Sequence, residues 1–255
     1  MASVSMIDLA SDLTCDAFLG GSLQIMQPRH GFRAATDPVL LAAGVSAQPG
    51  NHVLELGCGV GVALLALGRR VPGLCLSGIE RQADYAALAR RNAALNGVEA
   101  EIVTADLAAV PLLLKRPFDY VLVNPPFYAA HAPAPTDAGR AAARHEETPL
   151  AVWIDIALRR LRPGGWLTMI HLAERLPDIL TQIGARAGSI AVRPLAARHG
   201  RRAGRILLQA QKGSRGEFRL LSPLILHAGE AHAQDGRDFT PEVQGVLRGG
   251  AALGW

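Results

Sequence analysis

The sequence predicts an α/β fold, in which a mostly parallel sheet is covered by helices on both faces. From Asn51 onward, short apolar runs alternate with stretches of helical period, which is typical of strands joined by crossover helices. A glycine-rich turn stands directly between the first such run and the first helical stretch, at 57–61. The 255 residues are 49% hydrophobic, which is enough to bury one sizeable core.

The first 50 residues are expected to form an extension to the main domain. Two short extended runs within 15–27 are hinged at Gly20-Gly21 and predict a hairpin. A helix is expected over 37–46, because Pro38 suits a first turn and the residues that follow are strongly apolar. Together the hairpin and the helix would form a partial lid.

The main domain is expected over 51–230, followed by a C-terminal extension over 231–255 to which no element is assigned. Strands are predicted at 52–56, 74–80, 101–106, 119–123 and 166–171, and helices at 60–70, 82–96, 148–161 and 176–187. Three further apolar runs follow at 189–195, 205–210 and 218–226. Residues 128–146, rich in Ala and Pro, are expected to form a long surface loop.

Composition restricts the class of protein. No apolar run approaches the ~20 residues that a bilayer span needs, and the first dozen residues lack the basic start of a signal peptide. The three cysteines, Cys15, Cys58 and Cys75, form no CxxC pair, which argues against a disulfide framework and against a zinc site. We therefore expect a cytoplasmic protein without a membrane span or a metal, and nothing in the sequence indicates its oligomeric state.

Positive charge is concentrated late in the chain. The net charge is only +4, but residues 186–219 hold nine Arg and Lys residues and a single acid, Glu217. Such a cluster is typical of a surface that binds a polyanion, and also of a solvated face in a protein that uses arginine throughout. Composition alone leaves both interpretations open.

The sharpest local signal is the glycine-rich turn, which reads Glu55-Leu56-Gly57-Cys58-Gly59-Val60-Gly61. Glycines between a strand and a helix allow a tight turn and a close approach of the backbone to a ligand at the helix N-terminus. The spacing is G-x-G-x-G and not the G-x-G-x-x-G of dinucleotide-binding folds, which disfavours a dehydrogenase.

Two acids close the next two predicted strands at the same edge of the sheet. Glu80 stands 25 residues after Glu55, where a carboxylate can accept hydrogen bonds from both hydroxyls of a ribose. Asp106 ends the third strand and is placed to meet the amino group of an adenine, although it could also cap the following turn.

Together these strand ends resemble the class I S-adenosylmethionine-dependent methyltransferases over residues 51–212. The resemblance implies a Rossmann-like fold with a seven-stranded sheet and S-adenosylmethionine as the cofactor. It places Glu55 near the methionine amino group, the glycines under methionine and ribose, Glu80 on the ribose and Asp106 on the adenine. The cofactor-binding residues implied at these strand ends are Glu55, Gly57, Cys58, Gly59, Gly61, Glu80 and Asp106.

The fourth strand ends in Asn124-Pro125-Pro126-Phe127, which indicates the kind of acceptor. The lone pair of an amine on a base or a carboxamide is delocalised, so such a nitrogen is a poor nucleophile. Two acceptors on a rigid turn, the Asn124 side-chain oxygen and the Pro125 carbonyl, can bond both amino hydrogens and localise that lone pair. Phe127 offers a face on which a flipped base can stack.

This tetrapeptide resembles the N-P-P-[FY] motif of methyltransferases that act on planar nitrogen. The resemblance makes Asn124, Pro125, Pro126 and Phe127 the catalytic residues, with Asn124 also beside the cofactor. No strong general base is needed if the amine becomes acidic only as the methyl group arrives.

Three earlier segments, 19–21, 27–33 and 36–43, resemble the bacterial family of tRNA1(Val) adenine-37 N6-methyltransferases. In that family this region packs over the cofactor, so Arg33 and Asp37 are candidate cofactor contacts, with helix entry as an equal alternative. The family also has a basic loop before its last strands. Here that loop would carry arginines for the phosphates of RNA, most readily of tRNA: Arg198, Arg201, Arg202 and Arg205.

Other functions remain open at this point. A carboxamide presents the same planar nitrogen, so methylation of a protein glutamine at N5, as in release factors, is the first alternative. Methylation of a guanine N2 in ribosomal RNA uses a similar motif. A protein that kept the fold only to bind RNA, without catalysis, is the non-enzymatic alternative.

Overall fold

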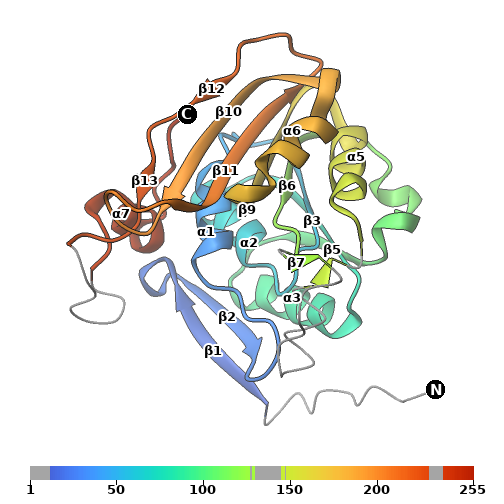
Figure 1. Ribbon diagram of the computed structural model, residues 1–255. Coiled ribbons are helices and arrows are strands. Elements are labelled where there is room, and N and C mark those ends of the chain that lie inside the picture. Colours follow the sequence, from blue (N-terminus) through green and yellow to red (C-terminus); the bar gives the residue numbers. More distant parts are fainter. Residues whose placement is uncertain (1–11, 127, 130–144, 147, 230–237) are drawn as a thin grey trace.

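In the computed structural model, the central sheet is built from strands that lie between residues 52 and 225 (Figure 1). The structure describes residues 12–126, 128–129, 145–146, 148–229 and 238–255. Within them, nine strands form this sheet: β3 (His52–Leu56), β4 (Cys75–Glu80), β5 (Ala100–Thr104), β6 (Phe118–Val123), β9 (Leu161–Leu172), β10 (Ala187–Ala196), β11 (Ala203–Lys212), β12 (Arg219–Leu220) and β13 (Leu224–Ile225).

The strand order is β12-β10-β11-β9-β6-β3-β4-β5, with β13 also alongside β10. Among the described strands of this sheet, β11 runs in the direction opposite to all the others. The seven longer strands confirm the expected Rossmann-like α/β sheet. The run at 218–226 was expected as one apolar stretch and instead forms two strands of two residues each at the edge of the sheet.

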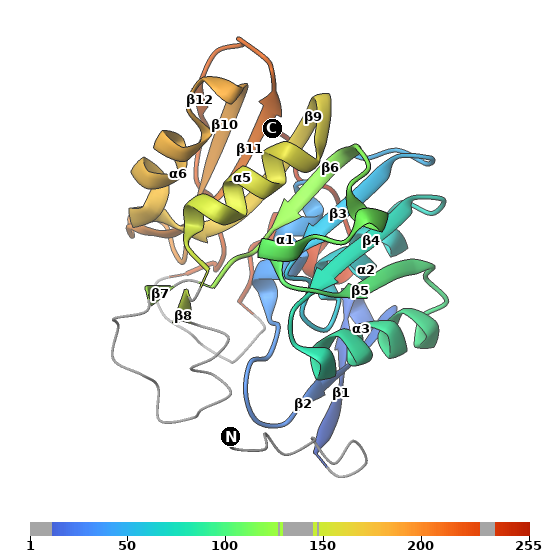
Figure 2. The ribbon, with the colours of Figure 1, turned by 90° about the vertical axis from the view of Figure 1, so that its right-hand side faces the viewer.

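Helices cover both faces of the sheet, as expected (Figure 2). One face packs against α1 (Thr36–Ala43), α2 (Val62–Arg70) and α3 (Ala83–Leu95), and the other against α5 (Leu150–Arg160) and α6 (Leu176–Ile183). Successive strand residues point to opposite faces, so Val53 joins the first cluster and Leu54 the second. None of the helices in the described residues is long and apolar enough to cross a membrane.

The predicted N-terminal hairpin is confirmed as β1 (Leu13–Phe18) and β2 (Leu23–Pro28). It is attached to α3 by two asparagines one helical turn apart. The Asn92 carboxamide accepts from the Met26 N–H and donates to the Met26 carbonyl, and Asn96 does the same with Gln24, at 2.7 to 3.1 Å. These side chains satisfy an edge of β2 as a neighbouring strand would, and so fix the hairpin beside α3.

The C-terminal residues, for which no element was expected, contain α7 (Pro241–Gly249). The Thr240 hydroxyl caps its first turn, and Gly250 ends it in the left-handed conformation with φ of 67°. Its two buried residues, Val243 and Val246, are too few to produce a clear helical period in the sequence. Beyond it, the Trp255 indole N–H donates to the Gly44 carbonyl at 2.7 Å, which fixes the end of the chain against α1.

Candidate active site

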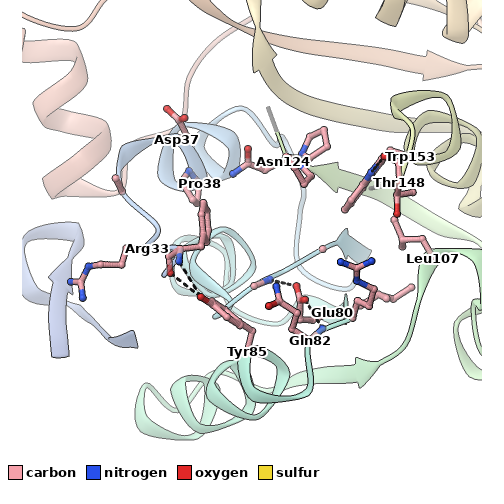
Figure 3. Close-up of a pocket in the computed structure, with 18 of the residues that line it drawn as sticks. Arg33, Asp37, Pro38, Glu80, Gln82, Tyr85, Leu107, Asn124, Thr148 and Trp153 are labelled. Atoms are coloured by element: carbon pink, nitrogen blue, oxygen red, sulfur yellow. Dashed lines mark hydrogen bonds between the residues drawn. The ribbon is translucent and has the colours of Figure 1, made fainter. Parts of the chain in front are cut away.

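A cavity of about 350 Å³ opens at the carboxyl ends of β3, β4, β5 and β6 (Figure 3). The N-terminus of α1 and the start of β11 complete its wall. Its lining comes from residues as far apart as Phe32 and Leu226. In parallel α/β sheets this edge is where ligands bind, because loops and helix N-termini converge there.

The glycine-rich turn forms one side of the cavity through Gly57 and Gly59, whose φ angles are 65° and 53°. Glycine adopts this left-handed backbone without strain. Space also requires glycine at position 57, since a Cβ there would lie 2.6 Å from Cη2 of Trp153. Gly61, at φ of 91°, precedes the first turn of α2, and Cys58 is buried; neither lines the cavity.

Glu55 lies beneath this turn rather than on the cavity wall. It is buried, and its Oε2 accepts a hydrogen bond of 2.9 Å from the Leu64 N–H in the first turn of α2. Burial raises the pKa of Glu55 to about 8, so the carboxyl is mostly protonated at neutral pH. In this structure Glu55 ties the end of β3 to α2.

Glu80 and Asp106 both line the cavity, each at the position expected from its strand. The Glu80 carboxylate accepts from the N–H of Gly59 at 2.9 Å and from that of Gln82 at 2.8 Å, so it joins the glycine-rich turn to the start of α3. Asp106 accepts from the Ala108 N–H at 2.8 Å and thereby caps the following turn. Each carboxylate has further lone pairs that can accept from a ligand.

The Asn124-Pro125-Pro126 segment also lines the cavity. Leu56 and Val123 are paired on neighbouring strands, so the residues that follow them, Gly57 and Asn124, lie next to each other at the sheet edge. Phe127 lies outside the described residues.

The N-terminal candidates both line the cavity but differ in their contacts. The Arg33 guanidinium is bound within the hairpin, to the Asp16 carboxylate, the Thr14 hydroxyl and the Pro28 carbonyl. Asp37, in the first turn of α1, forms an ion pair of 2.7 Å with Nε of Arg205. Burial raises the pKa of Asp37, and the charge of Arg205 opposes that rise.

The basic segment 198–205 is not one loop. The expectation that Arg205 precedes the strand is wrong: β11 begins at Ala203, because Ala203 and Arg205 pair with Ala196 and Leu195 of β10. Arg205 therefore reaches the cavity from a strand. The exposed members are Arg201 and Arg202, in the turn between the two strands.

Arg198 is directed into the protein. Its side chain is only 10% exposed, and its guanidinium bonds to the Asp238 carboxylate at 2.7 Å and to the carbonyls of Ala228 and Gly229. Asp238 also bonds to the His227 ring at 2.9 Å. These contacts attach the C-terminal segment to the turn after β10, and they leave the Arg198 charge neutralised within the fold.

Comparison with known proteins identifies the fold's family. A protein-family model described as the methyltransferase small domain matches residues 35–180, more than half of the chain. The chain belongs to that family. The protein is an S-adenosylmethionine-dependent methyltransferase of the Rossmann-like class I fold, which confirms the enzyme class expected from the motifs.

The methyltransferase also has relatives with specific names. It is 36% identical over 174 residues to a tRNA1(Val) (adenine(37)-N6)-methyltransferase of Porphyromonas gingivalis, covering 64% of this chain and 68% of the relative. It is 30% identical over 191 residues to a protein of the same name from Aeromonas hydrophila, covering 72% and 79%. These relatives confirm the expected resemblance to the tRNA1(Val) adenine-37 N6-methyltransferase family.

Solved structures agree on the fold. A protein of Agrobacterium tumefaciens described as a "predicted O-methyltransferase" superposes on the methyltransferase with a TM-score of 0.68 and 27% identity, covering 85% of this chain and 98% of that one. A 16S rRNA N2 methyltransferase of T. thermophilus, in complex with AdoMet and guanosine, gives a TM-score of 0.54 at 21% identity, covering 78% and 50%. At that lower identity the likeness shows the fold alone.

The cavity of the methyltransferase fits S-adenosylmethionine, which supplies an electrophilic methyl group when bound. The absence of a side chain at Gly59 leaves open space above the turn, and Glu80 and Asp106 provide the acceptors that ribose hydroxyls and an adenine amino group require. Among the described residues, no three His, Cys, Asp or Glu side chains gather as a metal site.

Sequence reasoning missed several residues that line the cavity. Trp153 was expected in the core, and it does pack there, but it also reaches the cavity. Tyr85 lines the cavity while its hydroxyl bonds to both the N–H and the carbonyl of Phe32, at 3.1 and 3.2 Å. The apolar periods of α3 and α5 show only that these residues are buried, and do not indicate which end of the sheet they face.

Proposed function

We propose that this methyltransferase modifies the exocyclic N6 amino group of an adenine in RNA, with tRNA as the substrate. The observation that carries the proposal is the position of Asn124. It follows β6 directly, faces the cavity from a turn made rigid by two prolines, and stands next to the cofactor turn at Gly57.

The residues at this position suit a planar amine. The Asn124 side-chain oxygen and the Pro125 carbonyl would each accept one amino hydrogen, which draws the nitrogen toward tetrahedral geometry. The nitrogen lone pair then forms the new N–C bond as the S–C bond breaks and its electron pair stays on sulfur. The amine loses a proton to water after its nitrogen has become positive. Since a hydroxyl offers one hydrogen where the site has two acceptors, the pair favours nitrogen over oxygen.

RNA is supported by the named relatives and by the surface around the site. The relatives from Porphyromonas gingivalis and Aeromonas hydrophila are named for adenine N6 in tRNA1(Val). Arg201 and Arg202 are exposed on the turn that leads into β11, and Arg205, the third residue of β11, lines the cavity. Two adjacent exposed guanidinium groups can follow a phosphate backbone. The proposed place of action is the cytoplasm, where tRNA is modified.

Methylation of a guanine N2 in ribosomal RNA is the second candidate. The chain is 36% identical over 100 residues to a ribosomal RNA small subunit methyltransferase C of Pseudomonas fluorescens, which covers 39% of this chain and 29% of that relative. The tRNA relatives match over a longer part of both chains. Adenine in tRNA is therefore preferred.

The test is methyl transfer from labelled S-adenosylmethionine to three separate pools: unmodified tRNA, ribosomal RNA and release-factor protein. Asn124→Ala serves as the blank, and the labelled pool is digested to identify the product. N6-methyladenosine from tRNA supports the proposal. N2-methylguanosine from ribosomal RNA or methylglutamine from protein would overturn the substrate. Absence of label in all pools, despite measurable cofactor binding, would overturn all three acceptors.

A further inference from the structure

Trp153 lines the cavity and lies against the glycine-rich turn. Trp153 is only 8% exposed, yet it lines the cavity together with Gly57, Asn124 and Thr148 (Figure 3). The far edge of its indole lies against Gly57, since a Cβ built there would be 2.6 Å from Cη2 and 2.9 Å from Cζ3. The ring therefore limits how far the cofactor turn can move toward α5.

The polar end of the same ring is also fixed. The indole N–H donates to the Thr148 carbonyl at 3.1 Å. Thr148 lines the cavity and comes two residues before α5, on the chain that follows the acceptor motif. One side chain thus contacts the turn at Gly57 with its apolar edge and the cavity wall at Thr148 with its donor.

We propose that Trp153 is a positioning residue for methyl transfer, which sets the spacing between the cofactor turn at Gly57 and the acceptor side of the cavity at Asn124 and Thr148. Gly57 and Asn124 follow paired residues of adjacent strands, so a small movement of the turn changes the distance between the methyl donor and the amine. Transfer rates depend on such distances more steeply than binding does. This inference rests on the proposed function only in the experiment that measures a rate of methyl transfer. The experiments that measure cofactor binding do not need the acceptor.

The first test compares Trp153→Phe with two matched controls, Trp166→Phe in β9 and Trp255→Phe at the C-terminus. Neither control residue lines the cavity. S-adenosylmethionine is titrated while tryptophan emission is recorded. The change in emission should persist in both controls and disappear in Trp153→Phe. A change that persists in Trp153→Phe would overturn the placement of this ring at the cofactor, whatever the acceptor.

The second test separates positioning from folding. For Trp153→Phe, kcat with the labelled acceptor should fall about tenfold or more, while the Kd of S-adenosylmethionine from calorimetry rises no more than about threefold. Trp166→Phe should leave both values unchanged. If Trp153→Phe lowered only the unfolding midpoint, with kcat per folded enzyme unchanged, the residue would be structural and the inference wrong.

A double-mutant cycle tests the contact itself. Gly57→Ala should raise the Kd of S-adenosylmethionine about thirtyfold in the native background, because its Cβ collides with the indole. In the Trp153→Phe background the same change should raise it only about fivefold, which is the expected effect of a left-handed alanine. Equal effects in the two backgrounds would overturn the coupling. This measurement needs no RNA, so its failure is distinct from failure of the proposed substrate.

Discussion

The proposed cofactor side and the proposed acceptor side of this cavity are built differently. On the cofactor side, one continuous stretch from Gly57 to Asp106 supplies the residues, and its carboxylates bond mainly to backbone N–H groups nearby. Around the rest of the cavity, contacts join remote segments, as the Asp37–Arg205 pair joins α1 to β11. The cofactor side depends on local strand ends, and the rest of the cavity on the packing of the whole sheet.

The largest expected effect follows from damage to the acceptor side alone. Asn124→Ala should reduce methyl transfer about a thousandfold, because it removes an acceptor that orients the amine. The Kd of S-adenosylmethionine should stay within about threefold, since the cofactor turn and Glu80 are unchanged. Single-turnover transfer and calorimetry measure the two quantities. Lost cofactor binding would contradict the division of the site into two sides.

On the cofactor side, Glu55 makes stability depend on pH. Its pKa is raised from 4.5 to about 8, so between these values the folded state holds a proton that the unfolded state releases. The free energy of unfolding should therefore fall as pH rises from about 4.5 to about 8. The folded-to-unfolded ratio should change by about eight hundredfold across this window.

Glu55→Gln tests this dependence, because glutamine can still accept the hydrogen bond from the Leu64 N–H but carries no proton to lose. Urea unfolding at pH 5.5 and pH 8.5 should show a clearly smaller difference in the variant than in the native protein. The same difference in both proteins would mean that Glu55 is not the source.

Glu80→Ala should weaken the cofactor side without affecting the acceptor groups. It leaves the N–H groups of Gly59 and Gln82 without their acceptor and removes the proposed ribose contact. We expect the Kd of S-adenosylmethionine to rise about thirtyfold, while kcat at saturating cofactor changes little. Calorimetry should show no change for Glu174→Ala, an exposed acid before α6. A native Kd in the Glu80 variant would contradict its role.

The smallest effect concerns the surface beside the acceptor side. Arg201→Glu with Arg202→Glu should lower tRNA affinity about tenfold at 0.1 M salt, and reduce the slope of log K against log salt by about 1.5. The matched control reverses two exposed charges away from the cavity, Arg69 near the end of α2 and Lys115 before the start of β6. Equal losses in both variants would indicate general charge attraction rather than a binding surface at the site.

The two sides also differ in how far the sequence predicts them. Glu80 and Asp106 were placed correctly at the cavity because a strand end fixes the position of its last residue. The Arg198 to Arg205 segment was expected as one basic loop, but the structure gives its arginines separate positions. Arg198 bonds to Asp238, Arg205 belongs to β11, and only Arg201 and Arg202 are exposed in the turn.

The sequence by itself determined the alternation of strands and helices between 52 and 183, the glycine-rich turn after the first of these strands and the rigid Asn124-Pro125 turn. These features depend on local backbone geometry and on apolar periods, which neighbouring residues set. Only the tertiary structure decided that Trp153 touches Gly57, that Arg205 pairs with Asp37, and that Arg198 faces inward. Those contacts depend on which segments the sheet brings together, and no local pattern contains that information.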